Sequence, residues 1–263
     1  MIKFNKITKI FGTNSHSLMK MINEGVDNKI IREKTGCTIS LREISFSLSE
    51  GKILTIMGLS GSGKSTLLKM ANGLIKPTFG DITLFGKKLN TLNSKELRNL
   101  RLWSVSMVFQ GYALFPHRNV IQNISFGMEL QNSSFNHKAY DFDLILDQVG
   151  LSGFEEYYPH QLSGGMQQRV GLARALATGA PLLLMDEPFS SLDSLTRREM
   201  QDLLINLQKR LKKTVIFVTH DFSEALKLGH SMIILKDGAI IQQGIGKEIV
   251  KNPINNYVRE ILT

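Results

Sequence analysis

The chain has 263 residues, of which 42% are hydrophobic, and 32 basic against 23 acidic side chains give it a formal net charge of +9. This length suits one large domain, or one domain with a sub-lobe, and supports a sizeable core. The single cysteine, Cys37, cannot form an internal disulfide, which favours a reducing compartment. The start lacks a signal-peptide pattern, and no run of about 20 apolar residues offers a membrane span.

The positive charge has two interpretations. It can indicate a nucleic acid or an anionic membrane surface as a partner. It can also reflect a lysine-rich composition with solvated faces. We favour the second interpretation, because the basic residues are scattered apart from the run 209–213. We therefore expect no nucleic-acid partner.

The N-terminal part of the sequence predicts half-buried antiparallel strands at 2–10, 38–48 and 81–84. An insertion at 14–36 separates the first two strands. Its apolar residues have a spacing that predicts two short amphipathic helices. These residues are Leu18, Ile22, Ile30 and Ile31.

The rest of the sequence alternates between strand and helix patterns. Nearly continuous apolar runs predict strands buried on both faces, as in a parallel sheet. The predicted strands are 52–57, 105–109, 182–185, 215–219 and 232–235, and the predicted helices are 65–71, 165–177, 195–211 and 222–228. This alternation favours a doubly wound α/β core.

A mainly helical stretch at about 94–164 interrupts the alternation and predicts an inserted helical lobe, with helices at 120–130 and 139–149. We find no internal repeat and no low-complexity tract. We expect residues 1–263 to form a single domain.

Residues 58–66, with the sequence GLSGSGKST, fit the Walker A pattern. They follow a predicted strand and open a predicted helix, which is the context that the motif requires. Backbone N–H groups and the helix N-terminus would face phosphate oxygens, with Lys64 at the β- and γ-phosphates and Ser65 on Mg²⁺. A plain glycine-rich turn is the alternative. The expected nucleotide-binding residues here are Gly58, Ser60, Gly61, Ser62, Gly63, Lys64, Ser65 and Thr66.

Two carboxylates, Asp186 and Glu187, end the strand pattern 182–185. Strand ends are where open α/β sheets place ligands. Asp186 is expected to hold Mg²⁺, and Glu187 to act as general base toward the attacking water. A solvated loop start would explain the pair alone, but not its position well after a Walker A motif.

Two further polar residues end predicted strands. His220 could contact the γ-phosphate or position the water, although a lone histidine is more often structural. Gln110 could touch both Mg²⁺ and water without adding charge. Both residues are expected in the catalytic set.

Residues 162–169, with the sequence LSGGMQQR, precede a predicted helix and offer a second anion site. A capped helix start would explain Ser163 but not the whole run. One chain already has a full phosphate cradle, so a second one indicates that the chain also serves a neighbour's nucleotide.

Taken in order, these motifs resemble the ABC ATPase family, with residues 191–193 (SLD) as the D-loop that contains Asp193. The resemblance implies a P-loop fold with a RecA-like parallel core, an antiparallel β subdomain and a helical lobe. It implies ATP and Mg²⁺ as cofactors, and a head-to-tail homodimer in which each signature acts on the other subunit's ATP. The signature residues are Ser163, Gly164, Gly165 and Gln167.

The same resemblance implies a membrane permease that docks near Gln110. The apolar run 113–116 fits part of that docking groove, and core packing explains it almost as well. Phe11 matches an aromatic residue that stacks on adenine in related ATPases, and a buried core phenylalanine is the alternative. The expected location is peripheral, on the cytoplasmic face of the inner or plasma membrane.

Within the family, the insertion 14–36 and the tail 252–258 resemble the glycine betaine/proline importer ATPases. This resemblance implies import of glycine betaine, proline or choline, with a periplasmic or extracellular solute-binding protein as an indirect partner. Many such ATPases continue into paired regulatory domains, and this sequence stops at Thr263. The alternatives are import of another polar solute such as an amino acid, and a soluble ABC ATPase acting on nucleic acid. The second alternative is disfavoured because the interval between Walker A and signature is short and carries no sustained heptads.

Overall fold

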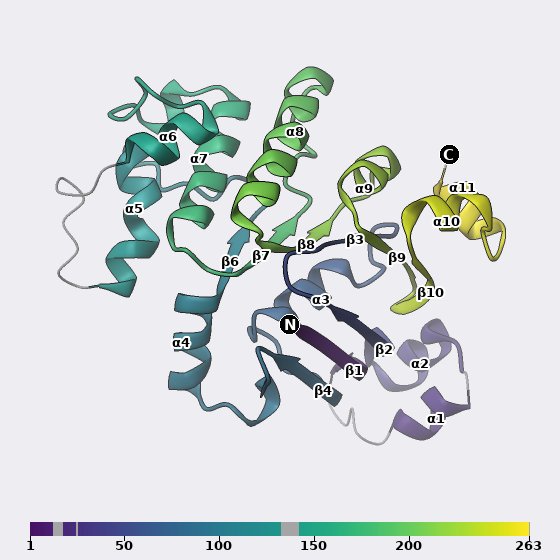
Figure 1. Cartoon of the computed structure of the whole chain (residues 1–263). Helices are drawn as coiled ribbons and strands as arrows, with labels where there is room; N and C mark the ends of the chain where they lie inside the picture. The colour runs from purple at the N-terminus through teal and green to yellow at the C-terminus, as the bar shows by residue number, and fades with distance from the viewer. Residues whose placement is uncertain (13–17, 25, 133–141, 263) are drawn as a thin grey trace. The chain divides into compact units, whose positions relative to one another are not determined.

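A computed structural model describes residues 1–12, 18–24, 26–132 and 142–262 (Figure 1). The chain divides into two compact units. The first contains Met1–Glu50, Leu54–Leu97 and His220–Thr263, and the second contains Gly51–Ile53 and Arg98–Thr219.

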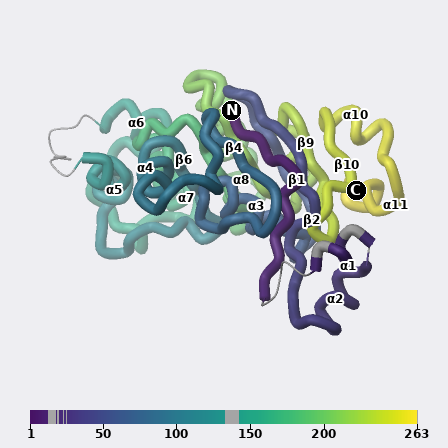
Figure 2. Tube along the Cα trace, turned by 90° about the horizontal axis from the view of Figure 1, so that it is seen from below, coloured from purple at the N-terminus to yellow at the C-terminus, as the bar shows by residue number. Residues whose placement is uncertain are grey.

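The first unit contains an antiparallel sheet with strand order β2-β1-β4-β5. Figure 2 shows β1 lying between β2 and β4. The predicted antiparallel strands are therefore confirmed. On one face of the sheet, Phe4 of β1 pairs in register with Phe46 of β2, and their rings stack with centroids 4.4 Å apart. The strands are β1 (Ile2–Phe11), β2 (Thr38–Leu48), β4 (Phe79–Leu84) and β5 (Lys87–Lys88).

The N-terminal insertion forms helices α1 (Met19–Asn23) and α2 (Asn28–Thr35) where the described residues cover it. Leu18, Ile22 and Ile31 pack in one buried cluster with residues of β1 and β2. Both predicted helices are present; in α2 Ile31 is fully buried, whereas its neighbour Ile30 is 43% exposed. Residues 14–17, which belong to the expected insertion, lie outside the described residues.

The first unit also contains part of the expected parallel core. Strand β3 (Ile53–Met57) is buried throughout and runs parallel to β9 (Ser231–Lys236). Strand β10 (Ala239–Gly244) pairs antiparallel with β9 and has no counterpart among the predicted strands. Its residues are mostly half-buried, so they do not form the continuous apolar run typical of a central strand. The helices of this part are α3 (Lys64–Ala71), α9 (Phe222–Leu228), α10 (Gly246–Lys251) and α11 (Asn256–Ile261).

The second unit holds three parallel strands in the order β8-β7-β6, as the apolar runs predicted. They are β6 (Val105–Val108), β7 (Leu182–Asp186) and β8 (Thr214–Val218). Helix α7 packs against α5, α6 and α8 within this unit (Figure 1). The helices are α5 (Val120–Gln131), α6 (Asp143–Val149), α7 (Gly164–Ala177) and α8 (Ser194–Leu211), while α4 (Ser94–Ser104) runs across the division between the units.

Strand β6 lies inside the mainly helical stretch expected at 94–164, where the sequence also predicts a strand at 105–109, and it pairs with β7. The predicted helix 139–149 is observed as α6 from Asp143 onward, and residues 139–141 lie outside the described part. Short 3-10 helices also form at Leu89–Thr91 and Pro159–Gln161. Among the described residues, no helix is both long and apolar enough to span a bilayer.

Candidate functional site

The glycine-rich loop after β3 has a backbone that glycine alone suits. Gly58, Gly61 and Gly63 have φ of 157°, 80° and 102°, in the region that side-chain-bearing residues rarely adopt. A Cβ on Gly58 would lie 2.5 Å from Leu235 O, and a Cβ on Gly63 would lie 2.5 Å from Ser40 O. The loop is therefore held in a tight curve between β9 and β2.

Lys64 opens α3, and its side chain is buried. Its Nζ donates hydrogen bonds to Gly58 O at 2.8 Å and Leu59 O at 3.1 Å, so the cation lies inside the loop. Ser62 Oγ is buried and finds no hydrogen-bond partner among the described protein atoms. A cation and an orphaned hydroxyl at a helix N-terminus fit a phosphate ligand, since buried polar groups are normally satisfied.

The remaining hydroxyl residues of this loop are more accessible. Ser60 and Ser65 are exposed, and Thr66 is half-buried. Thr66 Oγ1 accepts a hydrogen bond from Ser40 Oγ at 2.8 Å, which ties the start of α3 to β2. Ser65 is therefore a solvent-exposed residue in the first turn of α3.

Phe11 and His220 belong to the same unit as the glycine-rich loop. Phe11 ends β1 with 43% of its surface exposed, so it is not the buried core phenylalanine that the sequence left open. Lys9 Nζ lies 5.0 Å from the centre of its ring. His220 is exposed directly before α9, whose first turn is capped by Asp221 through Glu224 N at 3.0 Å.

In the second unit, Asp186 ends β7 and Glu187 follows with a left-handed φ of 45°. Such a conformation costs about 1–3 kcal/mol in a residue other than glycine and persists where the surroundings enforce it. Glu187 N donates to Val218 O at 3.0 Å, and Ser190 Oγ donates to Glu187 O at 2.9 Å. The backbone of Glu187 is therefore fixed at the carboxyl end of the strand, where a catalytic carboxylate would be needed.

Gln110 is exposed two residues beyond the end of β6, which stops at Val108 rather than Phe109. In the apolar run 113–116, Phe115 packs on Phe126 with centroids 4.5 Å apart. Among the described residues, His, Cys, Asp and Glu side chains form no cluster of three or more that could hold a metal ion.

The expected signature lies at the start of α7. Ser163 is the N-cap and accepts from Met166 N at 3.3 Å, so the capped-helix interpretation holds for this residue. Gly165 packs against α8, because a Cβ there would lie 2.5 Å from Thr196 Cγ2. Gln167 Nε2 donates to Leu162 O at 3.1 Å.

Asp193 caps α8 by accepting hydrogen bonds from Leu195 N and Thr196 N, each at 3.0 Å. Hydrogen bonds from Thr196, first that of its side chain, hold the pKa of this carboxyl below its usual range. The Asp193 cap is therefore present at neutral pH and is lost only when the pH falls through the lowered pKa.

The sequence did not single out Tyr112, whose hydroxyl lies 3.0 Å from Ser191 Oγ beside Asp193. Its position two residues after Gln110 was the only signal in the sequence. Tyr257 belongs to the tail 252–258 that the sequence analysis identified, but its contact was not predicted: its hydroxyl donates to Leu235 O at 3.1 Å, on the strand that flanks the glycine-rich loop.

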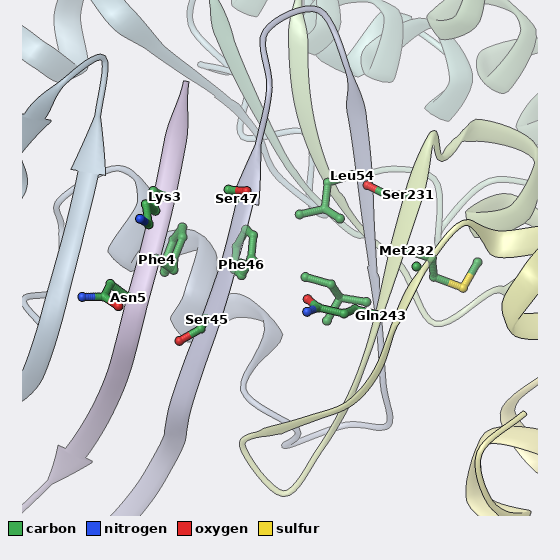
Figure 3. A pocket seen from close by; sticks show the side chains of 12 residues that line it. Lys3, Phe4, Asn5, Ser45, Phe46, Ser47, Leu54, Ser231, Met232 and Gln243 are labelled. Carbon is green, nitrogen blue, oxygen red and sulfur yellow. The ribbon is translucent and has the colours of Figure 1, made fainter.

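A separate cavity of about 460 Å³ lies in the first unit, between the β1–β2 face and strands β3, β9 and β10. Phe4, Phe46 and Leu54 point into it, and Lys3 and Gln243 lie among the polar residues around it (Figure 3). None of the predicted site residues lines this cavity. Its position near the start of β1, away from Phe11 at the other end of that strand, separates it from the candidate nucleotide-binding residues.

A family model described as "ABC transporter" matches residues 41–190. Together with curated relatives that match nearly the whole chain, this match shows that the chain belongs to the ABC transporter family. The chain is 48% identical over 261 residues to the glycine betaine/carnitine transport ATP-binding protein GbuA of Listeria monocytogenes, covering 99% of this chain and 66% of the relative.

Two further relatives are also ATP-binding proteins of transport systems. The glycine betaine/proline betaine transport system ATP-binding protein ProV of Escherichia coli is 43% identical, covering 98% of this chain and 64% of the relative. The trimethylamine N-oxide transport system ATP-binding protein TmoW of Pelagibacter ubique is 44% identical, covering 98% of this chain and 76% of the relative. The chain spans 62–66% of the length of the first three curated relatives.

Among solved structures, the fold resembles the ATP-binding cassette MJ0796, determined as a dimer in a post-hydrolysis state with ADP and Pi bound. The TM-score is 0.76 at 31% identity, and the match covers 93% of this chain and 98% of that one. The predicted α/β P-loop fold of the family is thereby confirmed.

Proposed function

We propose that this chain binds ATP with Mg²⁺ and hydrolyses it to drive solute import through a separate membrane permease. The observation that carries the ATP assignment is the glycine-rich loop. Its curved backbone, the buried Lys64 and the orphaned Ser62 hydroxyl together suit a chain of phosphates.

The catalytic roles follow from the chemistry of each side chain. Glu187 accepts a proton from water as the water oxygen bonds to the γ-phosphorus, and the bond from that phosphorus to the bridging oxygen breaks to release ADP. His220 positions the γ-phosphate and the water. Mg²⁺, held by Ser65, Gln110 and Asp186, would neutralise phosphate charge. Phe11 stacks on adenine without reading its edges, which its exposed ring supports.

The working form proposed here is a head-to-tail homodimer. One observation that supports it is the dimeric state in which the related cassette MJ0796 was determined with hydrolysis products. In that arrangement the signature residues Ser163, Gly164, Gly165 and Gln167, with Asp193 nearby in sequence, act on the ATP of the partner subunit. The permease and an external solute-binding protein complete the assembly, with the ATPase bound peripherally at the cytoplasmic face of the membrane.

We further propose that the imported solute is a small quaternary ammonium compound or related compatible solute. The relatives GbuA, ProV and TmoW support this class, because the names of all three concern methylated amines or betaines. The experiment is reconstitution of this chain with its permease and binding protein in proteoliposomes. ATP hydrolysis stimulated by glycine betaine, proline or choline supports the assignment. Stimulation by an amino acid other than proline, or by a sugar, with no response to these three solutes overturns the solute class and leaves the ATPase assignment standing.

A further inference from the structure

Tyr112 is in contact with two of the motifs in the second unit. It follows Gln110 by two residues, and its Oη lies 3.0 Å from Ser191 Oγ, which precedes Asp193 by two residues. The same hydroxyl lies against the start of α7, because a Cβ on Gly164 would be only 2.8 Å from Tyr112 Oη. One side chain therefore touches the signature and the D-loop, and its backbone continues the segment of Gln110.

The backbone of Tyr112 is fixed as firmly as its hydroxyl. Tyr112 and Ala113 have left-handed φ of 56° and 49°. This backbone conformation is energetically unfavourable for residues that carry a side chain. Arg174 of α7 opposes that cost by donating from Nη2 to Tyr112 O at 3.1 Å and from Nη1 to Ala113 O at 2.7 Å. The helix that begins with the signature thus also holds the segment that follows Gln110.

This arrangement makes independent movement of the three segments costly. A shift of the Gln110 segment that carries Tyr112 with it would change the contacts of the Tyr112 hydroxyl with Gly164 and Ser191. Coupling between two sites can be carried by a series of packed groups when a movement at one end alters the contacts at the other end.

We propose that Tyr112 is a positioning residue that couples the two nucleotide sites of the dimer. This inference rests on the proposed function. In it, Gln110 responds to the ATP bound by its own subunit. Tyr112 transmits that response to the signature and D-loop, which the same subunit presents to its partner's ATP. Its hydroxyl lies beside Gly164 and is within hydrogen-bond distance of Ser191 Oγ. Tyr112 itself touches no reacting atom.

The test measures the ATP dependence of hydrolysis for the wild type, Tyr112→Phe, Ser191→Ala and the double variant. Tyr112→Phe keeps the ring and removes only the hydroxyl. Tyr157→Phe is the matched control, since Tyr157 is an exposed tyrosine of the same unit that stacks edge-on with Phe154. The readouts are the Hill coefficient, the rate at saturating ATP, and the equilibrium affinity of the monomer for ATP.

In the wild type the Hill coefficient should exceed one, within the limit of two set by the two sites. Tyr112→Phe and Ser191→Ala should each lower it toward one and slow saturated hydrolysis about threefold to tenfold, the scale of one lost hydrogen bond. Monomer affinity for ATP should stay within about twofold, a separation of effects that a merely structural role would not produce. The double variant should be no slower than the slower single variant, since both remove the same contact.

Additive effects of the two substitutions, or an unchanged Hill coefficient in Tyr112→Phe, would overturn the inference. A parallel loss of monomer affinity would also overturn it. The wild type tests the proposed function by itself: if it hydrolyses ATP with a Hill coefficient of one, the coupling is wrong and the ATPase assignment stands.

Discussion

The hydroxyl of Tyr257 donates to Leu235 O at 3.1 Å, and that carbonyl in turn closes the space beside Gly58. The C-terminal helix α11 thereby fixes the strand against which the glycine-rich loop packs. Lys236 Nζ lies 4.5 Å from the centre of the Tyr257 ring. Gly238, which follows β9, is also bound to the glycine-rich loop, because its N–H donates to Ser62 O at 3.2 Å.

Tyr257→Phe should lower the free energy of unfolding by at least about 0.5–1.5 kcal/mol, because it removes the hydrogen bond to Leu235 O and keeps the ring packing. Urea unfolding followed by circular dichroism measures the change. The exposed Tyr157→Phe serves as control and should change stability by less than about 0.5 kcal/mol. Equal effects of the two substitutions would show that the Leu235 contact adds nothing to stability.

The same tyrosine predicts a pH dependence. Burial, with a smaller contribution from the charge of Asp237, raises the Tyr257 pKa above its ordinary value of 10.0, although a hydrogen bond from the Leu59 backbone acts in the opposite direction. The neutral phenol is favoured in the folded state. Its contribution is therefore complete below the unfolded pKa and is lost as pH rises through the folded value.

The stability difference between the wild type and Tyr257→Phe should accordingly be constant from pH 7 to about pH 9 and shrink above about pH 10. Urea titrations at a series of pH values measure it. A difference that grows with alkaline pH would contradict the neutral-donor assignment.

Gly63→Ala should destabilise the protein through two effects. The left-handed backbone costs about 1–2 kcal/mol for a residue with a Cβ, and the contacts with Ser40 O and Leu41 Cδ2 add about 1–3 kcal/mol of overpacking. Gly153→Ala is the control, because Gly153 also has a positive φ of 89° but would place its Cβ in open space. Calorimetry of both variants should give the larger loss for Gly63; equal losses would mean that the crowding is relieved at no cost.

Phe11→Ala should weaken ATP binding by about 1–3 kcal/mol if the exposed ring stacks on the base. Phe11→Tyr keeps a ring face and should bind within about 0.5 kcal/mol of the wild type. Because stacking does not read the base edge, GTP should substitute for ATP with similar affinity. Isothermal titration measures these affinities, and an alanine variant that is folded and binds ATP as tightly as the wild type would rule out stacking.

Much of the fold could be predicted because its signals are local. The apolar run before Gly58 and the glycine spacing up to Lys64 define a strand, loop and helix within a few residues, and the structure has them there. Strand β10 could not be predicted in this way. It lies antiparallel beside β9 with half-buried residues, so its pairing and not its apolar content defines it.

The supporting contacts of the candidate site depend on long-range packing. Tyr112 reaches Ser191 across 79 positions of sequence, and no local pattern encodes that distance. Packing also explains two glycines that the sequence attributed to phosphate binding alone. Gly164 leaves room for the Tyr112 hydroxyl and Gly165 leaves room for Thr196, whatever further role they have toward a nucleotide.

Glu187→Gln should leave ATP binding within about twofold of the wild type and slow hydrolysis about 10²–10⁴-fold, because the amide keeps the shape of the carboxylate but cannot accept a proton. Val218 and Ser190 hold the strained backbone of Glu187 through hydrogen bonds to the main-chain N and O of Glu187. A change of the Glu187 side chain should therefore not disturb these bonds. The variant should also accumulate as an ATP-bound dimer, visible as a mass shift on a sizing column.

Single-turnover hydrolysis of ATP by the purified chain with Mg²⁺, wild type against Glu187→Gln, tests the central claim most directly. The account predicts phosphate release by the wild type and its near-complete loss in the variant, with bound ATP retained in both. Near-normal release by Glu187→Gln would contradict the catalytic assignment of Glu187, and absence of release by a folded, ATP-bound wild type would contradict the proposed ATPase function itself.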